Sequence, residues 1–134
     1  MKNKATTRVI FVGMHNKPHK TPLCSSTKSG KLIDRIAKNF THIKTNLYDV
    51  DYYPKGIEEK YQLSCDWLYR INPGENEVVV LLGREVHDNC VYEPLFKNVI
   101  KIPHPSSQRS HEQMDAYVLQ AIKKINEKMK KIPK

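Results

Sequence analysis

A chain of 134 residues, 39% of them hydrophobic, is long enough to form one domain with its own core and leaves little room for a second domain. It has no apolar run long enough to span a membrane, no signal peptide and three irregularly spaced cysteines, which favour reduced thiols over a disulfide framework. We therefore expect a soluble, cytoplasmic protein, or a nuclear one in a eukaryote. The formal net charge of +9 is typical of a surface that captures polyanions, although such a charge can also serve solubility alone.

The first half of the chain predicts two strands and two helices in alternation. A β-branched run over residues 8–13 predicts a buried strand, and a long polar loop follows it to residue 29. Apolar residues recur at helical spacing over 30–40 and again from 57 to 71, with a second strand predicted between them over 41–48. The second helix is expected to stop at Asn72-Pro73-Gly74.

The second half continues the alternation. Residues 77–82 are almost entirely apolar, which is typical of a strand buried on both faces of a parallel sheet. A short helix is predicted over 84–90 and a fourth strand over 99–102. Ser110 and Gln113 form the pattern of a capping box at the start of the last helix. Its apolar stripe predicts core packing: Met114, Tyr117, Val118, Ala121, Ile122, Ile125 and Met129.

Strict alternation of strands and helices predicts a single α/β domain over residues 1–134, with three α/β/α layers around a central four-stranded parallel sheet. In such sheets ligands bind outside the carboxyl ends of the strands. The segments that leave those ends are 13–29, 46–56, 83–89 and 103–110, and they contain most of the unusual polar residues.

Two polar residues follow predicted strands. His104 lies between Pro103 and Pro105, which restrict the backbone and so the direction of the imidazole. A neutral imidazole there could donate a hydrogen bond to charge that develops on a leaving group, or the segment could be a simple proline-rich turn. Asn46 offers a paired donor and acceptor that suit the edge of a nucleobase, although asparagine also forms turns at strand ends.

The first loop carries two further patterns. Gly13 allows close approach of the backbone to a ligand, and His15 or Asn16 could orient a water molecule. Hydroxyls and a lysine precede or open the next helix, an arrangement that favours phosphate binding, with helix capping by Ser29 as the other interpretation. These residues are Ser25, Thr27, Lys28 and Ser29.

Metal binding and cysteine catalysis have little support. His15, His19 and Cys24 are close in sequence but lack the spacing of a metal site, so no metal is predicted. No cysteine follows a strand–turn–helix elbow of the kind that presents a nucleophile.

Five segments, in order, resemble motifs of the uracil-DNA glycosylase superfamily, especially its thermostable iron–sulfur-type branch. They are FVGMHNKPH, PLCSSTKSGKLIDRI, KTNLYD, VVVLLGREV and KNVIKIPHPSS, and together they cover nearly the whole chain. Of the cysteines expected for the cluster of that branch only Cys65 is matched, so we predict no iron–sulfur cluster and no other cofactor.

The resemblance implies a DNA repair hydrolase that cleaves the N-glycosidic bond of a flipped-out uracil-like or modified base in single- or double-stranded DNA. On this pattern His104 hydrogen-bonds the base as negative charge builds, and Asn46 reads the base edge. Asn16 or His15 positions the attacking water. The base pocket is further lined by Gly13, Met14, Leu23 and Ser106, with Leu23 in place of the stacking aromatic of the family.

On the same pattern phosphates are held by Ser106, Ser107 and the stretch Ser25, Thr27, Lys28 and Ser29. Gln108 or Arg109 occupies the position from which family members wedge into the duplex. The expected partner is DNA, with no membrane association and a monomeric protein. Two alternatives are a non-catalytic nucleic-acid or nucleotide-binding module on the same fold, and a different α/β enzyme acting on free nucleotides or sugar phosphates.

Overall fold

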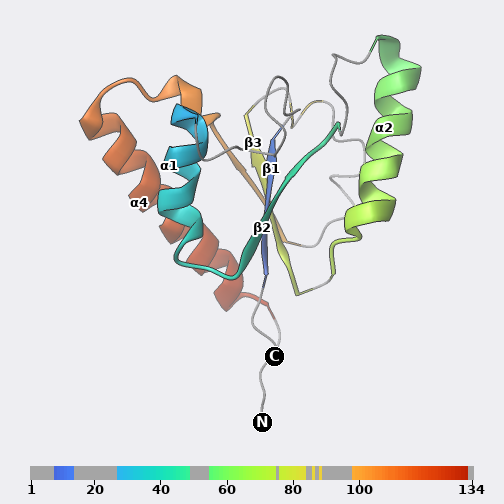
Figure 1. Ribbon diagram of the computed structural model, residues 1–134. Coiled ribbons are helices and arrows are strands. Elements are labelled where there is room, and N and C mark those ends of the chain that lie inside the picture. The colour runs from blue at the N-terminus through green and yellow to red at the C-terminus, as the bar shows by residue number, and fades with distance from the viewer. Residues whose placement is uncertain are drawn as a thin grey trace.

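The computed structural model describes residues 8–13, 27–48, 55–74, 76–83, 86, 88 and 98–132. Strands and helices alternate along this part of the chain as far as β3 (Figure 1). The elements are β1 (Val9–Gly13), α1 (Lys28–Ala37), β2 (His42–Asn46), α2 (Gly56–Ile71), β3 (Val78–Leu82), β4 (Val99–Ile102), the 3₁₀ turn η2 (Pro105–Ser107) and α4 (His111–Lys130).

The four strands form one sheet in the order β2-β1-β3-β4, and every neighbouring pair is parallel. In the register Val12 lies beside Thr45 on one side and Leu81 on the other. β1 therefore lies between β2, which is added on one side, and β3, which is added on the other side, so the direction in which strands are added reverses at β1. This reversal places a topological switch point at the carboxyl ends of β1 and β3.

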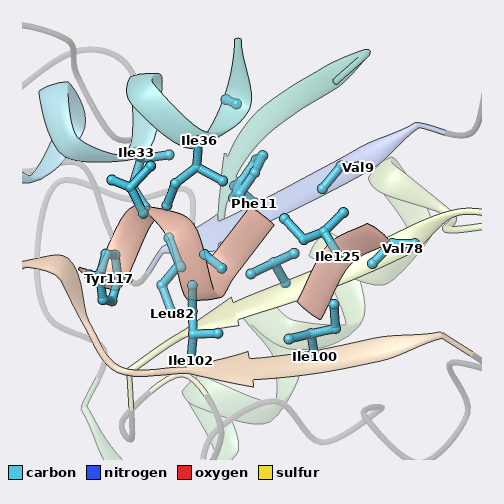
Figure 2. Packing of buried hydrophobic residues seen from close by; sticks show 14 of the residues in the cluster. Val9, Phe11, Ile33, Ile36, Val78, Leu82, Ile100, Ile102, Tyr117 and Ile125 are labelled. Atoms are coloured by element: carbon cyan, nitrogen blue, oxygen red, sulfur yellow. The ribbon is translucent and has the colours of Figure 1, made fainter. Parts of the chain in front are cut away.

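Helices cover both faces of the sheet. α1 and α4 pack on one face, where Phe11 and Leu82 contact a core that includes Ile33, Ile125 and Tyr117 (Figures 1 and 2). α2 covers the other face, where its side chains, Trp67 among them, pack against the alternate residues of the strands. The predicted α/β fold, with a four-stranded parallel sheet covered on both faces, is confirmed.

The strand positions agree with the sequence prediction to within two residues, and the last helix begins with the predicted capping box of Ser110 and Gln113. Helix α1 differs: it begins at Lys28, because Oγ1 of Thr27 accepts a hydrogen bond from the Gly30 amide at 2.9 Å. The interpretation of Ser29 as the capping residue is therefore wrong. The short helix predicted over 84–90 lies largely outside the described residues.

The structure also bears on the expectations for membrane-spanning helices and for the cysteines. No helix in the described part of the chain is long and apolar enough to cross a membrane. Cys65 lies on α2 as a thiol, whereas Cys24 and Cys90 lie outside the described residues.

Candidate functional site

The carboxyl ends of the four strands meet at one edge of the sheet. Gly13 lies beside Asn46 in the register, and Leu82 lies beside Ile102. The Gly83 amide donates to the Ile102 carbonyl at 2.9 Å, so β3 and β4 stay joined to their ends. Since α1 connects two parallel strands, its first turn lies at this same edge (Figure 1).

His104 follows β4 at this edge and is half-buried. The backbone N–H of Ser106 donates to its Nδ1 at 3.1 Å, and the Ser106 hydroxyl lies 2.8 Å from the same nitrogen. Because a backbone N–H can only donate, Nδ1 must carry a lone pair, and the proton of the neutral ring is on Nε2. A neutral His104 therefore has its donor N–H at Nε2.

Two residues outside the predicted set position His104. Gly83 has φ +93°, and a Cβ at this position would lie 3.0 Å from the Cβ of His104. Glycine is needed here both for the backbone conformation and for the close approach of the imidazole. On the other side, the Tyr117 hydroxyl donates to the carbonyl of Pro103 at 2.6 Å. The segment that holds His104 is thus anchored to β3 and to α4.

The Tyr117 phenol remains a donor at any ordinary pH. Burial raises the pKa of this hydroxyl well above its usual range, so that it stays protonated. The sequence showed Tyr117 only as a member of the apolar stripe of α4. Its hydroxyl could have indicated a second role, since a buried tyrosine normally has a hydrogen-bond partner for that group.

Asn46 ends β2 and is only 3% exposed. Within the described part of the chain its Nδ2 has no hydrogen-bond partner. The two residues before Asn46 show which face of the sheet Asn46 occupies. Lys44 forms an ion pair with Asp34 of α1. Thr45 accepts a hydrogen bond from Trp67 of α2. By the alternation of the strand Asn46 lies on the α1 side.

A buried amide donor without a partner destabilises the folded protein by about 1–3 kcal/mol. A ligand acceptor at the carboxyl edge would compensate this cost. Among the described side chains at this edge, Asn46 is therefore the one most clearly prepared for a ligand.

The first turn of α1 supplies further donors. Helix α1 contacts η2, so this turn and the turn that contains Ser106 lie side by side. Helix geometry leaves the N–H groups of the first turn without intrahelical partners. One of them, the N–H of Gly30, donates a hydrogen bond to the Thr27 hydroxyl. Lys28 is exposed and Ser29 half-buried at this end of the helix. The arrangement favours an anion, as the sequence analysis expected for a phosphate.

The three predicted residues after Ser106 form hydrogen bonds within the protein: Ser107, Gln108 and Arg109. The Ser107 hydroxyl donates to the His104 carbonyl at 2.7 Å, and the Gln108 amide donates to that hydroxyl at 2.6 Å. The backbone N–H of Arg109 donates to Gln113, and its exposed side chain lies between η2 and α4. These bonds stabilise the turn after His104.

The structure thus brings Gly13, Asn46, His104 and Ser106 to one edge, together with the first turn of α1. Met14, His15, Asn16, Leu23 and Ser25 lie outside the described residues. Among the residues that are described, no group of three or more histidine, cysteine, aspartate or glutamate side chains could hold a metal ion.

The identified groups are mainly hydrogen-bond donors: the imidazole N–H of His104, the amide of Asn46 and the backbone N–H groups of α1. Such a set suits a ligand rich in acceptors and negative charge, such as a base carbonyl beside a phosphate. Neither the models of known protein families nor the curated proteins include a match to this chain.

Proposed function

We propose that this protein has a uracil-DNA glycosylase-like fold and hydrolyses the N-glycosidic bond of a uracil-like or modified base flipped out of DNA. The five ordered motifs support this proposal, and the four-stranded parallel sheet is the architecture that the motifs imply. The observation that carries it is the Nδ2 group of Asn46, which is buried at the carboxyl edge and has no hydrogen-bond partner among the described residues.

A carboxamide has one donor group and one acceptor group side by side, and so does the edge of a uracil-like base. The Nδ2 of Asn46 would donate to a base carbonyl, which removes the cost of leaving this donor unsatisfied. An apolar ligand would gain nothing from Asn46. The residue therefore favours a polar, planar ligand over a lipid or an aliphatic substrate.

His104 supplies the second part of the chemistry. When the bond between C1′ and the base nitrogen breaks, its electron pair stays on the base, which becomes anionic. The Nε2–H of His104, set by the Ser106 bond to Nδ1, would donate to the base oxygen where this charge develops. Water then adds to C1′ and gives up a proton, which neutralises the departing base. Asn16 or His15 would position that water.

The second candidate function is a module that binds nucleic acid or nucleotides without cleaving them. It is favoured by the segment after β1, which contains no aspartate or glutamate between Gly13 and Asp34. Asp34 itself forms an ion pair with Lys44. A carboxylate that activates water is therefore missing from the segment where the family resemblance would place one.

The deciding experiment measures abasic-site formation on single- and double-stranded oligonucleotides that contain uracil, hypoxanthine or other altered bases. We expect release of at least one of these bases. Salt-dependent DNA binding without any release by the folded protein would contradict hydrolysis and support the binding module. Neither release nor DNA binding would contradict both functions and indicate an enzyme of free nucleotides or sugar phosphates.

A further inference from the structure

β4 is an edge strand of the sheet, and a groove of about 240 Å³ runs between it and the second half of α4. The strand contributes Val99, Ile100 and Lys101 to the walls. The helix contributes Lys124, Glu127 and Lys128, and its C-cap residue, Lys131, also lines the groove. We call this feature the basic groove. It lies outside the site described above, at the opposite edge of the sheet from β2.

The basic groove has a large excess of positive charge, with four lysines and one glutamate. Lys124, Lys128 and Lys131 recur at spacings of four and three, so they form a single stripe along α4. No ion pair joins any of these three to a carboxylate within the described part of the chain. In contrast, Lys44 and Arg35 on the same side of the sheet are paired with Asp34 and Asp115.

The basic groove is connected to the candidate site. A second hollow of about 230 Å³ is lined by Pro103 and Gln108, which follow β4, and by residues of α4 as far as Lys124. Lys124 also lines the basic groove, so the two hollows adjoin. Pro103 directly precedes His104. The two hollows therefore form a path from the segment before His104 to the basic groove, with Gln108, Gln120 and Lys124 among the polar residues of its lining.

The dimensions suit one nucleic-acid strand. Lys124 and Lys131 are seven residues apart, which corresponds to about 10 Å along the helix. Three lysines spread over this length can contact successive phosphates of one strand. A lysine is a flexible point charge that binds phosphate without demanding a fixed geometry.

We infer that the basic groove binds the phosphate backbone of a single nucleic-acid strand that continues from the nucleotide held at the carboxyl edge. That the nucleic-acid strand continues from the carboxyl edge rests on the proposed function, but the binding of phosphates in the groove does not. The substrate would then be a strand with several nucleotides on one side of the recognised base, rather than a free nucleotide.

The test compares two triple variants with equal loss of charge. The groove variant carries Lys124→Gln, Lys128→Gln and Lys131→Gln. The control carries Lys55→Gln at the N-cap of α2 with Lys123→Gln and Lys130→Gln. The last two are exposed on α4, about 80° to 160° around the helix from the three groove lysines. Binding of a labelled oligonucleotide of about 15 nucleotides is measured over a series of salt concentrations, and circular dichroism checks that each variant is folded.

Affinity falls as salt rises, and the loss of three phosphate contacts should make this dependence shallower, by about 2 in the slope of log affinity against log salt. Binding of the groove variant should also be weaker roughly 100-fold at about 0.1 M salt. The control should keep the wild-type slope. Binding of a dinucleotide should be the same in the wild type and both variants, because it does not reach the groove. Each single lysine variant should lower the slope by about 0.7.

An unchanged slope in the groove variant, or an equal decrease in the control, would overturn the inference. So would preferential binding of an acidic peptide over an oligonucleotide of equal charge, which would identify a protein partner. Failure of the proposed hydrolysis is recognised separately, because the wild type would then release no base although the slopes of the two variants still differ.

Discussion

Thr45 and Asn46 are adjacent in β2, nearly equally buried and on opposite faces of the sheet, yet their hydrogen bonding differs. On the α2 face the Thr45 hydroxyl accepts a bond from the indole N–H of Trp67 at 3.2 Å. On the α1 face the amide nitrogen of Asn46 has no partner among the described residues. A buried polar group that is satisfied within the fold stabilises it, whereas one left unsatisfied is available to a ligand.

The same contrast extends to the flanking elements. On the α2 face Trp67 and Thr45 lie among apolar side chains, and the hydrogen bond between them satisfies both groups within the packing. Near the α1 face, His104 and the first turn of α1 direct donors to the carboxyl edge. We therefore expect substitutions on the α2 face to change stability and those at the edge to change function.

The largest effect is expected for His104→Ala. Loss of the imidazole donor should reduce base release about 100- to 1,000-fold and leave DNA affinity nearly unchanged. His111→Ala, at the exposed start of α4, is the matched control and should retain full activity. Base release by the His104 variant at the wild-type rate would show that our role for His104 is wrong.

Asn46→Leu should separate function from stability. We expect base release or ligand affinity to fall about 100-fold, because the base edge loses its donor. The free energy of unfolding should stay equal or rise by about 1 kcal/mol, since an unsatisfied buried amide is removed. Denaturant titration and the release assay measure the two quantities. A strongly destabilised variant with normal ligand binding would reverse our assignment of Asn46.

Trp67→Phe should have the opposite pattern. It removes the donor to Thr45 and should lower the free energy of unfolding by about 1–3 kcal/mol, with unchanged base release once the protein is folded. Thr45→Val removes the acceptor of the same bond, and combining the two substitutions should cost less than the sum of the single effects. Additive costs would mean that the bond does not couple the two residues.

The smallest effect is expected for Tyr117→Phe, which removes the bond to the Pro103 carbonyl and should cost about 1 kcal/mol. Burial raises the pKa of Tyr117 in the folded protein, so above about pH 10 the unfolded chain loses this proton while the folded protein keeps it. Wild-type stability should therefore fall as the pH rises above about 10, and less steeply in the variant. Unfolding curves at pH 9 and pH 11 provide the comparison, and equal slopes would exclude Tyr117 as the titrating group.

The sequence alone predicted the described strands and helices and the edge of the sheet at which the candidate residues lie. Strands over 78–82 and 99–102 could be identified because β-branched runs have few other stable arrangements, and the capping box at Ser110 depends only on local hydrogen bonds. His104 and Asn46 were found because parallel strands bring their carboxyl ends to one edge. These features depend on neighbours in the chain or on a general rule of the fold.

Tertiary structure decided what depends on distant partners. The strand order β2-β1-β3-β4 is a property of how segments pair, and local periodicity does not contain it. The bond from Tyr117 to Pro103 and the close approach of Gly83 to His104 join residues 14 and 21 positions apart. Only the folded chain shows that Nδ2 of Asn46 is buried with no partner among the residues that the structure describes, because satisfaction of a polar group is set by what surrounds it in space.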